Sequence, residues 1–161
     1  MATEIDPPTD HRTPLSQLEE MGLLAWTQVS NDKIPLHSFM GLRVLEVGGG
    51  KAKVDCELTP QLQGQAEPIH GSFVITLAAV AAACATWGAW DPATTLIIAQ
   101  ESHTRHLGQP RSSPITAEGQ LVHRGKRALH SEAIVTDGGG YTLARTSHTW
   151  GVITNYGGTP Q

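Results

Sequence analysis

The stretch EPIHGSFVITLAAVAAACATW, residues 67–87, decides the fold that we expect for this chain. From Gly71 to about Trp87 its apolar residues recur at three- and four-residue spacing, which is typical of a helix. So many alanines in one helix indicate that backbone approaches it closely on nearly every side. The stretch therefore predicts a central helix wrapped by a sheet, with His70 at its mouth and Ser72 in its first turn.

Strand patterns surround this helix along the chain. In residues 51–58 apolar and charged side chains alternate, which indicates a strand with one buried face and one wet face. Glycine-rich turns separate most of the strands, as in an antiparallel meander. The other strand candidates are residues 42–47, 94–107, 115–125, 127–137 and 141–153. This order predicts an α+β domain whose curled antiparallel sheet surrounds one helix.

The length of 161 residues fits a single domain with a real core. Residues 1–14 are polar and proline-rich and predict a flexible N-terminal arm. Residues 15–35 predict a helical lead-in, and residues 36–161 form the expected domain. Because the edges of such a sheet tend to pair between subunits, we expect a homodimer or homotetramer.

Bulk properties narrow the partners and the compartment. A net charge of −4 and a pI near 6.0 argue against nucleic acid as a partner. No signal peptide opens the chain, and no apolar run approaches the roughly 20 residues of a membrane span, so no membrane partner is expected. Cys56 and Cys84 lie in apolar-patterned segments and predict reduced, buried thiols. We therefore expect a cytoplasmic protein.

Three segments carry a resemblance to a known family: FMGLRVLEVGGGKAKVDCELTPQL (39–62), IHGSFVITLAAVAAACA (69–85) and ITAEGQLVHRGKRALHSEAIVTDGGGYTLARTSHTW (115–150). They resemble the hotdog-fold acyl-CoA thioesterases of the phenylacetate and 4-hydroxybenzoyl-CoA types. The most specific element of that family is His-Gly-Gly at the helix mouth, present here as His70-Gly71-Ser72. A weaker match is the late turn Gly125-Lys126-Arg127. The resemblance implies the hotdog fold and a thioester substrate.

The resemblance also implies how the helix mouth acts. In the family, backbone amides at the helix start polarise the thioester carbonyl, a role that would fall here to Gly71 and Ser72. The family places Asp or Glu nine residues after the histidine, where this chain has Ala79. No carboxylate occurs between Glu67 and Asp91. Loss of a general base commonly lowers a rate by about two to four orders of magnitude.

Two other family positions also lack their usual side chain. The family's Asn before the histidine corresponds to Gly64, and its Ser or Thr on the next strand falls near Ala99. The hydrolytic half of the site is therefore changed, while its carbonyl-polarising half is retained.

Glu101 and His103 are the predicted replacement for the missing chemistry. Alternate residues of a strand share a face, so these two side chains point the same way and form an acid/base pair. The alternative is a wet strand face whose charges contribute little. His70 and Glu67 are further catalytic candidates at the helix mouth. Their alternatives are a histidine that fixes the turn and a surface carboxylate of the loop.

The remaining polar residues suggest a nucleotide contact and no metal. Arg124, Lys126 and Arg127 fit the phosphates of coenzyme A, and the alternative is a solvated basic turn. His103 and His106 face opposite ways on a strand, so no metal site is predicted. No tightly bound cofactor is expected, and coenzyme A enters as part of the substrate.

The sequence thus predicts a hotdog enzyme, similar to acyl-CoA thioesterases, that acts on a small acyl thioester, with an aromatic acyl group as one option, or on a related carbonyl compound. One alternative is a non-hydrolytic reaction such as dehydration, cyclisation or decarboxylation. Another is a non-catalytic protein that binds acyl-CoA or a hydrophobic ligand. A third is a structural partner of an active homologue in a hetero-oligomer.

Overall fold

A computed structural model describes residues 34–64, 69–90 and 94–154. The predicted arm and nearly all of the predicted lead-in lie outside these ranges. The elements are α2 (Pro35–Met40), β1 (Arg43–Gly48), β2 (Lys51–Cys56), the 3-10 turn η1 (Pro60–Leu62), α3 (Gly71–Ala85), β3 (Thr95–His106), β4 (Ile115–Arg124), β5 (Ala128–Thr136) and β6 (Thr142–Thr154). Each predicted strand is present, with ends that differ by one or two residues, whereas η1 was not predicted.

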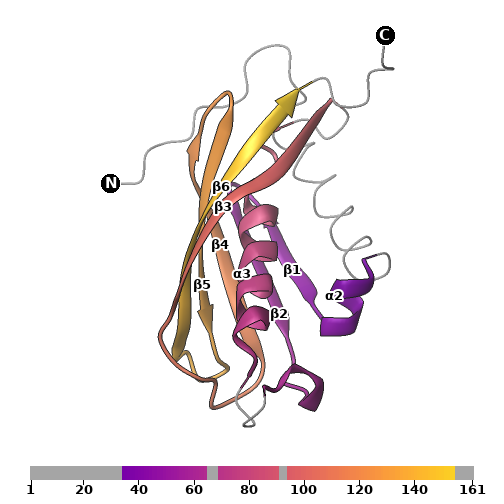
Figure 1. Cartoon of the computed structure of the whole chain (residues 1–161), viewed down its shortest axis with the longest axis vertical. Coiled ribbons are helices and arrows are strands. Elements are labelled where there is room, and N and C mark those ends of the chain that lie inside the picture. Colours follow the sequence, from indigo (N-terminus) through magenta and orange to yellow (C-terminus); the bar gives the residue numbers. More distant parts are fainter. Residues whose placement is uncertain (1–33, 65–68, 91–93, 155–161) are drawn as a thin grey trace.

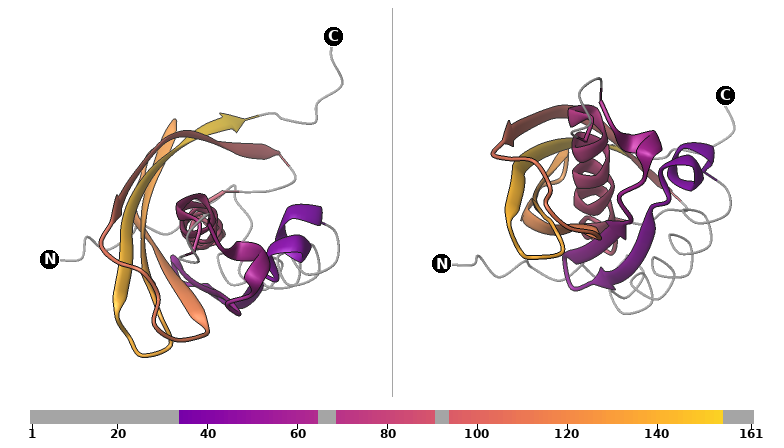
Figure 2. Two further views of the ribbon diagram at one scale, coloured as in Figure 1. Left: turned by 60° about the horizontal axis from the view of Figure 1, so that its bottom comes forward. Right: turned by 90° about the horizontal axis from the view of Figure 1, so that it is seen from below.

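The strands form one six-stranded antiparallel sheet in the order β1-β2-β4-β5-β6-β3. The sheet curls around α3, which lies in its hollow (Figures 1 and 2). The predicted α+β architecture of a curled sheet around a central helix is confirmed.

Small side chains bring α3 against the sheet. Ala52, Gly119 and Ala133 stand side by side on β2, β4 and β5. A Cβ atom added to Gly119 would lie 2.5 Å from the carbonyl carbon of Ala81, with the carbonyl oxygen nearer still. Residue 119 therefore has to be glycine for the backbones of β4 and α3 to approach this closely. The contact lies at Ala81 and Ala82, whose small side chains suit so close an approach.

A β-bulge divides β3, which lies at one edge of the sheet. Ala99 pairs with Trp150 and Glu101 pairs with Thr149, so Gln100 is an extra residue on β3. Because the bulge inserts one residue, the alternation of side chains on β3 shifts there. The side chain of Gln100 crosses the space over Gly151, where a Cβ would lie 2.7 Å from its amide nitrogen.

Two histidines, His37 and His148, are buried in the fold. His37 and His148 are 7% and 4% exposed. His148 bonds Thr146 Oγ1 through Nε2 at 2.9 Å and stacks on Trp150. Burial lowers the pKa of both imidazoles, because it penalises their charged form.

We expect the free energy of unfolding to fall as pH is lowered through about 6.5, because the unfolded chain binds protons that folded His148 rejects. Each such histidine contributes a slope of at most ~1.4 kcal/mol per pH unit between its folded and unfolded pKa values. Urea unfolding at pH 5, 6 and 7 measures this slope. The variant His148→Gln should show a shallower slope, and an unchanged slope would mean that His148 is charged in the folded state.

Among the described residues, no helix is long and apolar enough to pass through a lipid bilayer.

Candidate functional site

His70 caps the start of α3. It has extended backbone angles, φ −67° and ψ 127°, and its Nδ1 accepts the backbone N–H of Ser72 at 3.2 Å. Its own N–H donates to the carbonyl oxygen of Leu62 at 2.8 Å. Because an amide can only donate, Nδ1 is the acceptor and neutral His70 carries its proton on Nε2. His70 therefore fixes the turn, which is one of its two predicted roles, and its catalytic role stays a prediction.

Of the two predicted backbone donors, Gly71 is the one that stays available. The amide of Ser72 is used by the cap. Gly71 is the first helical residue, so its N–H has no partner within the helix. No acceptor elsewhere among the described residues bonds this N–H. Its N–H points out of the positive end of the helix, as suits a developing negative charge.

Ser72 also brings a hydroxyl to the cap. Its Oγ lies 2.6 Å from His70 Nδ1, in hydrogen-bond contact. No base is adjacent to Ser72 in the sequence, so the sequence did not predict this pairing. The contact between Ser72 Oγ and His70 Nδ1 depends on the cap geometry, which folds His70 back over the first turn.

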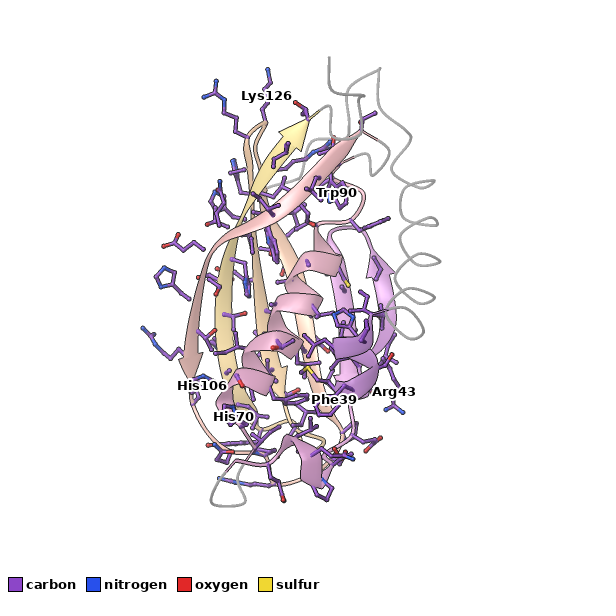
Figure 3. All side chains as sticks on the ribbon, turned by 45° about the vertical axis from the view of Figure 1, so that its right-hand side comes forward. Phe39, Arg43, His70, Trp90, His106 and Lys126 are labelled. Carbon is purple, nitrogen blue, oxygen red and sulfur yellow. The ribbon has the colours of Figure 1, made fainter. Side chains whose placement is uncertain are left out.

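An apolar cavity of about 300 Å³ opens beside the helix start. Its walls come from α2, from the segment around η1 and from the first two turns of α3. Phe39 is 68% exposed and lies near the first turn of α3 (Figure 3). The cavity is lined by Leu36, Phe39, Met40, Gln61, Leu62, Gln63, His70, Ser72, Phe73 and Thr76.

Glu101 and His103 pair as predicted but face away from the helix. Glu101 Oε1 lies 2.8 Å from His103 Nε2, and both side chains are well exposed. They stand opposite Thr149 and Ser147, which alternate on β6 with the buried His148. Cross-strand partners share a face, so the pair lies on the outer face of the sheet.

The outer-face placement agrees with the alternative of a wet strand face. The bulge at Gln100 turns the pair to the far side of the sheet from Gly71. The pair does border a small outer hollow of about 220 Å³ with His130 and Glu132. Its catalytic role stays a prediction.

The residue of β3 that does reach the helix start is His106. It stands opposite the buried Ala144, so it faces α3. Its ring atoms Cε1 and Nε2 lie 3.5 and 3.6 Å from the place that a Cβ on Gly71 would occupy. Figure 3 shows His106 and His70 together at this end of α3. Sequence reasoning weighed His106 only as a metal ligand, and the face assignment that would have found it depends on the bulge.

The basic turn lies far from the helix start within one protomer. Lys126 is at one end of the sheet, whereas His70 and Phe39 are near the other (Figure 3). Arg124 ends β4, and Lys126 and Arg127 follow in the exposed turn before β5. The structure therefore does not join the predicted nucleotide contact to the helix start in a single chain.

Acidic and thiol groups do not fill the gap left by Ala79. Ala79 is half-buried on α3, Glu67 lies outside the described residues, and no described carboxylate lines the cavity. Burial raises the pKa of Cys56 to about 12 and also raises that of Cys84, so neither thiol ionises near neutral pH. Within the described ranges, no group of three or more His, Cys, Asp or Glu side chains could hold a metal ion.

Comparisons with known proteins agree with this architecture. No protein-family profile matches the chain. The chain is 26% identical over 102 residues to a 1,4-dihydroxy-2-naphthoyl-CoA hydrolase of Listeria monocytogenes serotype 1/2a, which covers 63% of this chain and 82% of that protein.

Two solved structures show the same fold. The PaaI protein from the phenylacetic acid degradation operon of E. coli superposes with a TM-score of 0.74 at 18% identity, covering 86% of this chain and 97% of that one. A thioesterase of Haemophilus influenzae gives a TM-score of 0.73 at 15% identity, covering 89% and 94%.

Proposed function

We propose that the chain belongs to the hotdog-fold acyl-CoA thioesterase superfamily and that it hydrolyses a small acyl-CoA thioester at the start of α3. The observation that carries this proposal is the N–H of Gly71, which has no partner among the described residues and whose chain neighbours His70 and Ser72 line an apolar cavity. An amide in that place would accept the negative charge that forms on a thioester oxygen during attack by water. The apolar wall would hold the acyl group.

The cavity supports a small, apolar acyl group. Its volume of about 300 Å³ lies at the lower end of the range for ligand pockets, about 300–1,000 Å³. Phe39 and Phe73 are aromatic walls, against which a flat ring can stack. An aromatic or short aliphatic acyl group fits this site better than a long chain does.

A homodimer would bring the nucleotide contact to the same place. β3 has twelve residues and is an edge of the sheet, where β6 is its one partner among the described strands. Such an edge is a template for a second copy. A two-fold axis through the middle of β3 would turn the partner chain end over end. The partner's basic turn, including Lys126, would then lie at the end of the sheet where this chain has His70.

Binding without hydrolysis is the second candidate, and Ala79 favours it. No described carboxylate lines the cavity, so the family's usual base is missing there. Such a protein would retain a thioester at Gly71 and release it unchanged.

The test incubates the purified full chain with aromatic and short aliphatic acyl-CoA thioesters and identifies every product by mass spectrometry. The expected products are free coenzyme A and the carboxylic acid. Binding of a thioester by calorimetry without any product would support the second candidate. A changed acyl group that stays attached to coenzyme A would instead establish a non-hydrolytic reaction.

A further inference from the structure

We propose that His106 is the proton-transfer residue of this site, an inference that rests on the proposed thioester hydrolysis. His106 is the last residue of β3. It comes from a different element than the helix residues, so its place depends on how the edge strand meets α3.

The register of β3 aims His106 at the helix start. After the bulge, Ser102, Thr104 and His106 face α3, because their partners on β6 are the buried His148, Thr146 and Ala144. At the end of this row, the ring of His106 lies in van der Waals contact range of a Cβ placed on Gly71. Glycine at position 71 leaves that space open, and the open space adjoins the free N–H.

The imidazole of His106 is available, in contrast to those of its neighbours. Its ring is exposed, and no hydrogen bond or ion pair within the described part of the chain engages it. His70 has its Nδ1 occupied by Ser72 and its proton on Nε2, so it has no free lone pair. His103 is engaged by Glu101 on the other face.

His106 and the apolar cavity lie on different sides of the helix start. Successive helical residues project about 100° apart, so Gly71 and Phe73 point to different sides of α3. His106 lies at the Gly71 side, and the apolar cavity lies at the side of Phe73 and Thr76. Seen along the helix, β3 and α2 flank α3 on different sides (Figure 2). A thioester with its acyl group in the cavity would present its carbonyl between the cavity and His106.

In the proposed step, His106 acts as a general base that activates a water molecule. Neutral His106 takes a proton from water as the water oxygen bonds to the carbonyl carbon. The C–S bond then breaks, its electron pair leaves with sulfur, and the imidazolium returns the proton to the thiolate. The products are the carboxylic acid and the thiol. Imidazole suits both transfers, because it changes protonation near neutral pH.

The test compares His106→Gln with two other histidine variants in the same hydrolysis assay. His106→Gln should lower kcat/KM by about 10²- to 10⁴-fold, the usual contribution of a general base. His123→Gln removes an exposed outer-face histidine of β4 and should stay within about threefold of wild type. The third variant, His103→Gln, removes the histidine of the outer-face pair with Glu101. All three variants should unfold at the same urea concentration as wild type, since the side chains removed are exposed.

A pH profile separates a proton-transfer role from a structural one. Wild-type kcat/KM should rise with pH along a limb of unit slope, and the residual rate of His106→Gln should lack that limb. If His106→Gln hydrolyses the thioester as fast as wild type does, the assignment of His106 is wrong, and the proposed function is unaffected. A loss in His103→Gln instead would assign the chemistry to the outer-face pair with Glu101. A wild-type protein that hydrolyses no thioester would overturn both proposals.

Discussion

Replacing Gly119 with alanine is expected to destabilise the fold by about 3 kcal/mol or more, at or above the upper end of the range for overpacked cores. The added methyl group would lie 2.5 Å from the carbonyl carbon of Ala81 and 2.9 Å from the amide nitrogen of Ala82. Both atoms belong to the backbone of α3, which cannot move aside as a flexible side chain can. The helix would have to shift away from the sheet and lose contacts along its whole buried face.

Urea unfolding measures this effect as a lower midpoint at unchanged slope. Gly139→Ala is the matched control, because a Cβ there would meet its nearest atom, Asp137 Oδ1, at 3.4 Å. We expect that control to stay within about 0.5 kcal/mol of wild type. Equal midpoints for the two variants would show that α3 and β4 are farther apart than the structure places them.

Replacing Gly71 with proline should remove most of the hydrolytic activity while the protein stays folded. Proline lacks an N–H and is favoured at the first helical position, which Gly71 occupies. The residue before a proline has to be extended, and His70 already is, with ψ 127°. Loss of one such donor lowers kcat by about 10²- to 10³-fold in enzymes that stabilise an oxyanion.

Gly71→Ala is the control for the volume added at this position. It keeps the N–H and places a methyl group 3.5 Å from the ring of His106, an ordinary contact distance. We expect a loss of less than about tenfold, since the oxyanion donor that proline removes is still present. Thermal melts of both variants verify the fold. If alanine and proline reduce kcat equally, then crowding at His106 explains the loss and the amide does not.

Most of the fold was predictable because its signals are local. The many alanines of the helix predict close packing, and the structure shows such packing where Gly119 meets the helix backbone. Alternation in residues 51–58 and the glycine-rich turns mark strands whose pairing follows chain order. The exceptions are β3, which pairs with β6 at the far edge, and β2, which pairs with β4 across the helix.

The site was less predictable, because its geometry depends on register and on cap formation. The sequence led to the helix start and to the contact between Glu101 and His103. It did not give the face of that pair, because no residue type marks Gln100 as a bulge. It also did not show that the cap uses the amide of Ser72, which leaves Gly71 as the donor.

The bulge at Gln100 affects how the sequences of proteins with this fold should be aligned. In a relative whose third strand has no bulge, the same side chains face the helix, but that strand is one residue shorter than β3. An ungapped alignment of the two strands would therefore match every helix-facing position after Ala99 to an outer-face position. A gap at Gln100 restores the correspondence, and the positions to compare in searches for related sites are then those of Ser102, Thr104 and His106.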